Sequence, residues 1–200
     1  MNIPYYVPKY DVGFICGRFN MLQDGHYDLI KTGLSLCRRL IVVVGSAQEH
    51  GTIRNPFRVE TRMQCIKECF LEYGDRIKIV SLPDLSNEND ISSDWGQYLL
   101  DFVTTIFHKK PNIMIYGNDE SRTRWFSNEQ LKNIAIHIIN RSDIPISGTQ
   151  VRELLALDNR EEWMKWIPDF LHYKYDELRA ELLECTYYRD LIKEKNNENC

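Results

Sequence analysis

The sequence predicts an α/β fold built on an open sheet of five parallel strands, with helices on both faces. Short runs of β-branched and apolar residues recur along the chain, and longer segments with helical spacing of apolar residues separate them. This alternation is typical of parallel sheets, whose central strands are buried on both faces. The chain has 200 residues, and 43% of them are hydrophobic, which is enough for one core. We therefore expect one Rossmann-like domain over residues 1–158 and a small C-terminal helical extension of that domain, with a frayed tail, over residues 159–200.

Five short segments, four of them mainly apolar and one with alternating apolar and basic residues, are the expected strands. They lie at residues 12–16, 40–44, 76–80, 112–116 and 135–139. The expected helices between them cover residues 27–39, residues 58–73, and a segment that begins at Trp95. Ser147 and Gln150 have the spacing of a capping box, which predicts a helix through Leu157. Two further helical segments, at residues 161–167 and 170–183, form the expected extension.

The loop after the first expected strand carries groups that suit an anion. It reads G-R-F-N-M-L-Q-D-G-H over residues 17–26. Gly17 allows a sharp exit from the strand, and Gly25 lets the backbone approach a ligand at the start of the helix. The N–H groups and positive end of that helix favour an anion, which His26 and the charged Arg18 can also contact. An ordinary crossover loop can carry the same residues, so this pattern does not decide the function by itself.

The loops after the later strands carry side chains that suit the same ligand. The loop after the second strand contains Ser46 and Arg54, and a long polar loop after the third contains Asp84 and leads to Trp95. Asn118 follows the fourth strand. Since loops at the carboxyl ends of neighbouring parallel strands open into one crevice, we expect the loop of Ser46 and Arg54 to face the first loop.

The helix expected after the fifth strand offers a second site for an anion. Ser147 is its predicted N-cap, and Thr149 and Arg152 lie in its first turn. Hydroxyl, guanidinium and backbone N–H groups at a helix N-terminus are the donors that phosphate prefers. The chain thus has a second helix N-terminus that can bind phosphate, and our central hypothesis is that it meets the first at one phosphate-bearing ligand.

Three motifs carry a resemblance to a known family. They are G-R-F-x-x-x-x-x-G-H, G-S-A-Q-x-x-x-T-x-R-N-P-F and I-S-G-T-x-x-R. In this order they closely resemble the nicotinamide mononucleotide (NMN) adenylyltransferases of the archaeal and bacterial type, within the nucleotidylyltransferase superfamily. Arg62 is similar to the arginine of the family's Glu-Arg pair, although Thr61 separates it from Glu60 here. One departure is Gln23, which stands where those families have His or Thr.

The resemblance implies an activity and a set of site residues. The NMN phosphate attacks the α-phosphorus of ATP, giving NAD and pyrophosphate. The catalytic roles fall on His26, Arg18, Arg152 and Gln23. The ATP-binding roles fall on Gly17, Phe19, Gly25, Asn118, Ser147 and Thr149. The NMN-binding roles fall on Ser46, Arg54, Asp84 and Trp95. Mg²⁺ is expected as a cofactor bound through the ATP phosphates and water, with no metal site made by the protein itself.

Two alternatives stay open at this point. Another nucleotidylyltransferase, such as phosphopantetheine adenylyltransferase, shares both phosphate motifs but does not account for the G-S-A-Q loop or Trp95. A non-catalytic nucleotide-binding module is the second alternative, because Gln23 cannot carry the charge of the family's histidine.

Charge, apolar content and cysteine usage limit the kinds of partner and the cellular compartment that we expect. The net charge of −4 does not favour a nucleic-acid partner, and we see neither a signal peptide nor a run of ~20 apolar residues that would span a membrane. Six cysteines without a C-x-x-C pair indicate free thiols in a reduced, cytoplasmic protein. The resemblance also allows a homo-oligomer. Either Arg122 or Arg124 could help to hold phosphate, but we favour the interpretation of both as surface charges.

Overall fold

The computed structural model describes residues 7–118, 121–140 and 146–198, and within them the chain forms one open parallel sheet. Its five strands stand in the order β3-β2-β1-β4-β5, and every neighbouring pair is parallel. The strands are β1 (Tyr10–Gly17), β2 (Cys37–Val44), β3 (Ile77–Ser81), β4 (Ile113–Gly117) and β5 (Ala135–Ile139). This confirms the predicted Rossmann-like sheet.

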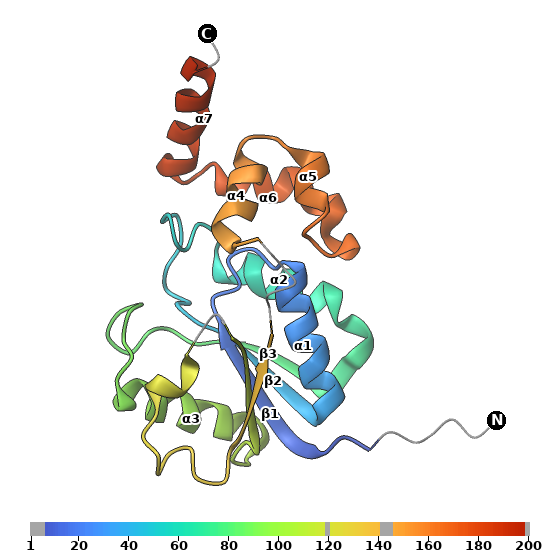
Figure 1. Cartoon of the computed structure of the whole chain (residues 1–200), viewed down its shortest axis with the longest axis vertical. Helices are drawn as coiled ribbons and strands as arrows, with labels where there is room; N and C mark the ends of the chain where they lie inside the picture. Colours follow the sequence, from blue (N-terminus) through green and yellow to red (C-terminus); the bar gives the residue numbers. More distant parts are fainter. Residues whose placement is uncertain (1–6, 119–120, 141–145, 199–200) are drawn as a thin grey trace, which may run out of the picture.

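Helices cover both faces of the sheet, as predicted (Figure 1). The α-helices of the described residues are α1 (Asp24–Leu36), α2 (Val59–Cys69), α3 (Ser93–Phe107), α4 (Gly148–Ala156), α5 (Arg160–Met164), α6 (Tyr175–Leu182) and α7 (Thr186–Glu198). Short 3-10 helices are η1 (Leu71–Arg76), η2 (Arg122–Trp125) and η3 (Asp169–Lys174). In Figure 1, α1 and α2 lie on the opposite side of the sheet from α3, and α4 to α7 gather at the top.

Successive side chains of the central strands face opposite sides of the sheet, so the apolar core forms two layers, one on each face. In β1, Phe14 packs with the residues under α3, whereas Ile15 packs with those under α1 and α2. In β2, Val42 and Val43 divide in the same way, and both are fully buried. Successive side chains of a strand point to opposite faces, so a strand covered on both sides must be apolar throughout. This is why β2 appears in the sequence as an unbroken apolar run over residues 40–44.

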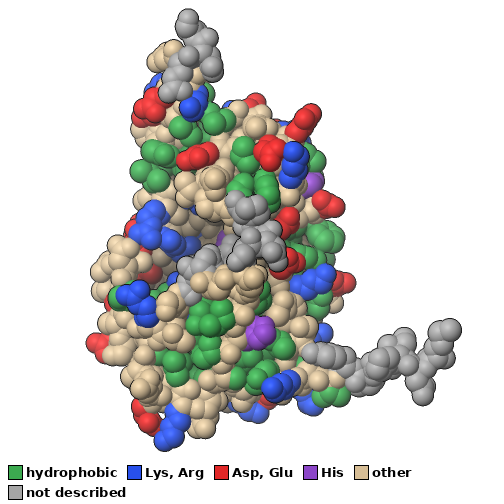
Figure 2. Space-filling model, in the orientation of Figure 1, with side chains coloured by type: hydrophobic (Ala, Val, Ile, Leu, Met, Phe, Trp, Pro, Cys, Tyr) green, Lys and Arg blue, Asp and Glu red, His purple; other side chains and the backbone are tan. Residues whose placement is uncertain are grey.

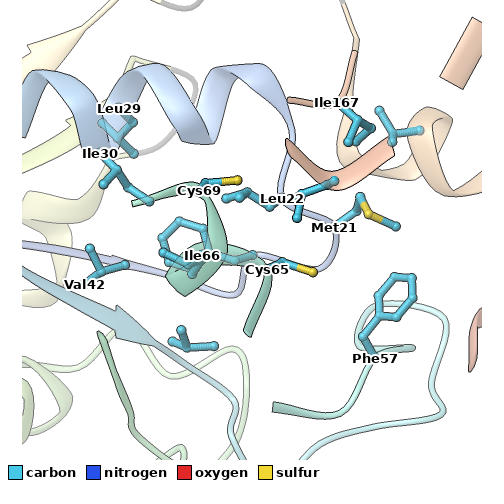
Figure 3. Packing of buried hydrophobic residues seen from close by; sticks show 14 of the residues in the cluster. Met21, Leu22, Leu29, Ile30, Val42, Phe57, Cys65, Ile66, Cys69 and Ile167 are labelled. Carbon is cyan, nitrogen blue, oxygen red and sulfur yellow. The ribbon is translucent and has the colours of Figure 1, made fainter. Parts of the chain in front are cut away.

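The loop between β1 and α1 is anchored in the core under α1 and α2. Met21 and Leu22 are buried there and pack in one cluster with Phe57, Ile66 and Ile167 (Figure 3). Burial of each such side chain stabilises the fold by roughly 1.5–3 kcal/mol. The polar residues of this loop therefore start from a backbone that apolar contacts hold in place.

The order of the strands predicts a ligand-binding crevice along the edge of the sheet that the carboxyl ends of the strands form. The chain runs outward from β1 through β2 to β3, and then returns to β4 on the other side of β1. Ligands of open α/β sheets bind outside the carboxyl ends of the strands at such a reversal. The loops that follow β1, β2, β3 and β4 all leave from this edge.

Several predicted boundaries differ from the structure. The segment expected to be helical over residues 161–167 forms α5 only as far as Met164, and the segment expected over residues 170–183 is divided between η3 and α6. Helix α1 ends at Leu36 instead of residue 39, because Cys37 is extended and already pairs with Tyr10 of β1. Helix α2 ends at Cys69 and continues as η1, in which Gly74 adopts a φ of 49°. The predicted frayed tail is helical over residues 193–198, which belong to α7.

Charge is distributed evenly over the surface in view. Figure 2 shows acidic and basic side chains interspersed on this face, in keeping with the mild net charge of −4. Among the described helices we find none with the length and apolar content that a bilayer crossing requires.

Candidate active site

The N-terminus of α1 orients His26. Gln23 is the N-cap of the helix, and its backbone N–H donates to Nδ1 of His26 at 3.4 Å. A neutral imidazole that accepts at Nδ1 carries its proton on Nε2, which is then a donor. The ring of Phe19 meets the imidazole edge-on, with 5.1 Å between centroids. Backbone and aromatic contacts thus hold a hydrogen-bond donor at the mouth of the helix.

The loop before α1 has a constrained backbone. Phe19 and Met21 have φ values of 52° and 66°, a region that non-glycine residues seldom occupy. Such conformations cost about 1–3 kcal/mol each and persist only where the surroundings impose them. Both side chains are buried in the core, which supplies that constraint. Phe19, predicted to shape an adenosine pocket, lies with its ring in the core beside His26.

The N-terminus of α4 lies against the same loop. Ser147 is its N-cap and forms the predicted capping box with Gln150. Arg152 is 7% exposed and donates from Nη1 to the backbone carbonyl of Asn20 at 2.7 Å. It also donates from Nη2 to Oγ1 of Thr149 at 3.1 Å. The two helix N-termini, more than 100 residues apart in sequence, are therefore neighbours in the fold.

A pocket of about 240 Å³ opens at the carboxyl ends of β1 and β2. Six predicted site residues line it, namely Gly17, Arg18, Ser46, Arg54, Asp84 and Trp95. The pocket is completed by residues that we did not predict: Cys16, Gly45, Asn87, Glu88, Asn89, Asp90, Ile91, Arg122 and Trp125. The remaining predicted residues lie outside its lining, either at the N-termini of α1 and α4 or, for Asn118, after β4.

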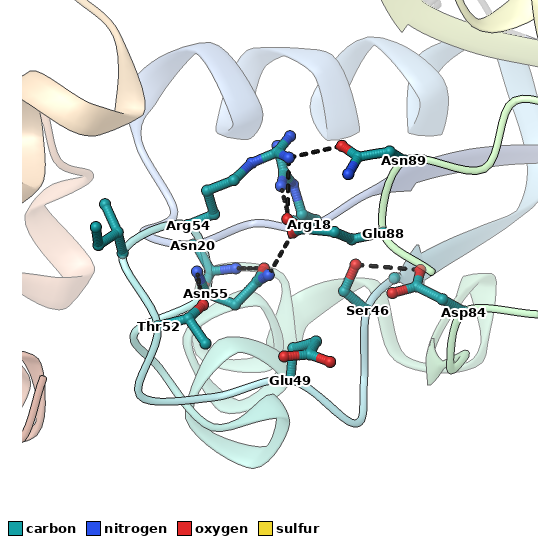
Figure 4. Close-up of polar contacts among 12 residues, drawn as sticks. Arg18, Asn20, Ser46, Glu49, Thr52, Arg54, Asn55, Asp84, Glu88 and Asn89 are labelled. Atoms are coloured by element: carbon teal, nitrogen blue, oxygen red, sulfur yellow. Dashed lines mark hydrogen bonds and ion pairs between the residues drawn. The ribbon is translucent and has the colours of Figure 1, made fainter. Parts of the chain in front are cut away.

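Glu88 joins the two predicted phosphate-binding arginines of this pocket (Figure 4). Its Oε2 accepts from Nη1 of Arg18 at 3.3 Å and from Nδ2 of Asn55 at 3.0 Å. Its Oε1 accepts from Nη1 of Arg54 at 3.0 Å. Three donors from the loops after β1 and β2 thus converge on one carboxylate, which marks the position as a site for an anion.

Asn20 and Asn55 hold these two loops together beneath the arginines. The Nδ2 of Asn20 donates to Oδ1 of Asn55 at 2.7 Å, and the backbone N–H of Phe57 donates to Oδ1 of Asn20 at 3.4 Å. Both asparagines are buried, so the contacts are protected from water. They fix the separation between the loop of His26 and the loop of Arg54.

Ser46 and Asp84 connect the loop after β2 to the loop after β3. Ser46 has a φ of 47° and donates from Oγ to Oδ1 of Asp84 at 3.1 Å. The other carboxylate oxygen accepts from Nε2 of Gln48 at 2.9 Å. The carboxylate of Asp84 is thus already bound by the neighbouring loop.

Trp95 forms the aromatic side of the pocket. Its indole is mostly buried and meets the ring of Trp125 at 6.1 Å between centroids and an angle of 80°. The guanidinium of Arg122 lies 4.2 Å from the centre of the Trp125 ring. The interpretation of Arg122 as a surface charge is wrong, because its side chain lines the pocket and stacks on an aromatic ring.

Arg62 is a buried guanidinium whose structural role we did not predict. It donates from Nη1 to the backbone carbonyls of Arg18 and Gly45, at 3.0 and 2.9 Å, and from Nη2 to that of Ser46 at 3.1 Å. Burial lowers the pKa of Arg62 to about 10, so the side chain stays charged at neutral pH. A signal was present in the sequence, since Arg62 falls between Val59 and Ile66 on the apolar stripe of its helix, where an unpaired charge is rare.

The acidic residues of the pocket are already bound to protein donors. Among the described ranges, no group of three or more His, Cys, Asp or Glu residues could hold a metal ion. Asp84 is bound by Ser46 and Gln48, and Glu88 by two arginines.

Comparison with known sequences matches this chain to one family model and to relatives that share one description. The model of the cytidylyltransferase-like family matches residues 14–154. A nicotinamide-nucleotide adenylyltransferase of Saccharolobus solfataricus is 28% identical over 169 residues, which cover 82% of this chain and 88% of that protein. A protein of the same description from Archaeoglobus fulgidus is 26% identical over 162 residues, covering 78% of this chain and 85% of that protein. These relatives confirm the resemblance carried by the three motifs.

Solved structures share the fold. A bifunctional NMN adenylyltransferase/ADP ribose pyrophosphatase from Francisella tularensis, complexed with AMP and a manganese ion, superimposes with a TM-score of 0.68 at 20% identity. The match covers 94% of this chain and 53% of that one, so this chain spans about half the length of the bifunctional protein. Because the family model covers most of the chain and the sheet has the same architecture, the chain belongs to the cytidylyltransferase-like family.

Proposed function

We propose that this protein is an adenylyltransferase that joins the AMP moiety of ATP to NMN and releases pyrophosphate. The observation that carries the proposal is the contact between Arg152 and the backbone of Asn20, which brings the N-termini of α1 and α4 together. Beside them lies a pocket lined by three arginines and two tryptophans, which suits a second phosphate and a flat cationic ring. Relatives that match most of this chain are named nicotinamide-nucleotide adenylyltransferases.

The reaction requires alignment more than activation of the nucleophile. An oxygen of the NMN phosphate forms a bond to the α-phosphorus of ATP, and the bond from that phosphorus to the bridging oxygen of the β-phosphate breaks. The electron pair leaves with pyrophosphate. A phosphate monoester has a second pKa near 6, so the nucleophile is already an anion at neutral pH. The protein therefore contributes positioning and stabilisation of negative charge.

His26 and Arg152 are assigned to the triphosphate. Nε2 of His26 donates to the α-phosphate as negative charge develops there, supported by the N-terminus of α1. Arg152 has five N–H donors, and its contacts with protein oxygens occupy three of its nitrogen atoms once each. One N–H on each Nη is left for the β- and γ-phosphates, with Ser147 and Thr149 beside them. Mg²⁺ neutralises the triphosphate when it is bound and is held by phosphate and water.

The pocket is assigned to NMN. Arg18 and Arg54 bind its phosphate in the place that Glu88 now occupies, and the indole of Trp95 stacks on the nicotinamide. Ser46 and Asp84 form the adjoining wall and offer polar contacts to the ribose and amide. Gln23, buried at the N-cap of α1, replaces the family's His or Thr with a neutral amide, which retunes the rate without removing the donors of His26.

The test is a pyrophosphate-release assay with ATP, Mg²⁺ or Mn²⁺, and a panel of acceptors. We expect turnover with NMN and formation of NAD, detected by chromatography. Phosphopantetheine as the preferred acceptor would assign the protein to a different nucleotidylyltransferase. Binding of ATP or NAD by calorimetry without pyrophosphate release would make it a non-catalytic module. Comparison of NMN with nicotinic acid mononucleotide in the same panel defines the acceptor, and size-exclusion chromatography tests the predicted homo-oligomer.

A further inference from the structure

Tyr188 connects the C-terminal helix α7 to the site. It lies outside residues 14–154, the part of the chain that the family model matches, and its side chain is fully buried. Its phenolic oxygen accepts from Nε of Arg152 at 2.6 Å, and its O–H donates to the backbone carbonyl of Ile53 at 3.1 Å. One hydroxyl thus links Arg152 to the loop after β2, next to Arg54.

Tyr188 completes the fixation of the Arg152 guanidinium. With the carbonyl of Asn20 on Nη1 and Thr149 on Nη2, each nitrogen of the guanidinium has one protein partner. A planar guanidinium bound at all three nitrogens cannot rotate about its last bonds without breaking a contact. The two remaining N–H groups therefore have a defined direction.

The hydrogen-bond partners of Arg152 named above are neutral, which distinguishes it from Arg18 and Arg54. Arg18 and Arg54 are paired with the carboxylate of Glu88, which cancels part of their charge. Arg152 is bound by a carbonyl, a hydroxyl and a phenol. Burial raises the pKa of Tyr188, so its oxygen stays protonated and neutral at physiological pH. Arg152 is oriented without loss of its positive charge, as an arginine that stabilises a developing anion requires.

We propose that Tyr188 is a positioning residue for adenylyl transfer, which directs Arg152 at the leaving pyrophosphate and couples it to the loop that contacts the acceptor. This inference rests on the proposed function. It makes α7 a part of the catalytic machinery instead of a peripheral extension. The alternative is that Tyr188 serves packing alone.

Tyr188→Phe distinguishes a positioning role from a packing role, because it keeps the buried ring and removes only the hydroxyl. The matched control is Tyr175→Phe in α6, which removes the hydroxyl of another buried tyrosine, hydrogen-bonded to Asp158 at 2.9 Å. We expect kcat of Tyr188→Phe to fall about tenfold, the effect of one misdirected charged donor. Both variants should lose a similar, small amount of thermal stability. Tyr175→Phe should keep the wild-type kcat.

A double substitution tests whether the effect passes through Arg152. In an Arg152→Lys background, Tyr188→Phe should lower kcat by less than twofold, since lysine has no Nε donor for the phenol. Wild-type kcat in Tyr188→Phe, an equal loss in Tyr175→Phe, or a full tenfold loss in the lysine background would each overturn the proposal. If the wild-type protein makes no NAD, the proposed function fails instead. Calorimetry with pyrophosphate then still tests the orientation of Arg152, and unchanged affinity in Tyr188→Phe would refute it.

Discussion

Arg62→Met should destabilise the protein and loosen both loops of the acceptor pocket. The substitution keeps much of the side chain's length but removes the Arg62 donors to the carbonyls of Arg18, Gly45 and Ser46. The carbonyl of Ser46 keeps a second donor, the backbone N–H of Glu49 at 3.1 Å. The contact with the carbonyl of Gly45 is buried, and a buried carbonyl left without a partner costs about 1–3 kcal/mol. Relief of the buried charge offsets part of this loss.

The net expectation is a decrease of about 1–3 kcal/mol in the free energy of unfolding. For a chain of this size each kcal/mol lowers Tm by about 2–4 °C, so Tm should fall by roughly 2–12 °C. Differential scanning calorimetry measures the shift. Because both loops line the acceptor pocket, KM for NMN should rise more than KM for ATP. Arg62→Lys keeps the charge and should fall between wild type and Arg62→Met.

Lys67→Met is the control, since Lys67 lies exposed on the same helix. It should leave Tm and both KM values unchanged. A Tm for Arg62→Met within 2 °C of wild type would refute this reasoning about the loops, because the buried carbonyls would then have found other partners.

Three further outcomes are expected. His26→Ala should lower kcat by about 10²–10³ with little change in Tm, measured by pyrophosphate release; full activity would remove His26 from the mechanism. Glu88→Gln should lower KM for NMN about three- to tenfold, because an incoming phosphate no longer displaces a carboxylate from the two arginines; a higher KM would mean that Glu88 orients them instead. Burial raises the pKa of the Cys37, Cys65 and Cys69 thiols from 9.0 to about 12. These thiols should therefore resist Ellman's reagent at pH 8 until the protein is unfolded. In the unfolded chain they ionise from about pH 9, so the free energy of unfolding should fall as pH rises from 9 towards 12; a rise in urea titrations would contradict this.

The central strands were predictable because burial on both faces leaves a local signal. Residues 40–44 are fully buried, and each of them is apolar. The end of α1 was harder to predict from the sequence, because Leu36, Cys37 and Leu40 also fit helical spacing. Pairing of Cys37 with Tyr10 decided the boundary, and that contact depends on a strand distant in the sequence.

Helix α7 depends even more on contacts with residues that are distant in the sequence. Its sequence is polar, and its buried Tyr188 packs in the apolar cluster under α1 and α2 and hydrogen-bonds to Arg152 and Ile53, which are distant in the sequence. Tertiary contacts stabilise most helices of this length more than their intrinsic propensity does. No local pattern within residues 186–198 contains that information.

Some residues of the candidate site could be predicted from the sequence, and others could not. Motif residues next to glycines, such as His26, were identified because a helix N-terminus and its donors are adjacent in sequence. Glu88, Arg62 and Tyr188 act across separations of 70, 44 and 36 residues. A glutamate in a polar loop and an arginine on a helix have many possible partners, and only the fold selects among them.

The most direct test of the central claim follows the phosphorus atoms of ATP. With NMN as acceptor, label at the α-phosphate should appear in NAD, and label at the γ-phosphate should appear in pyrophosphate, in equal amounts. Transfer of γ-label to the acceptor, or retention of both labels in ATP while the nucleotide binds, would contradict adenylyl transfer at the joined N-termini of α1 and α4.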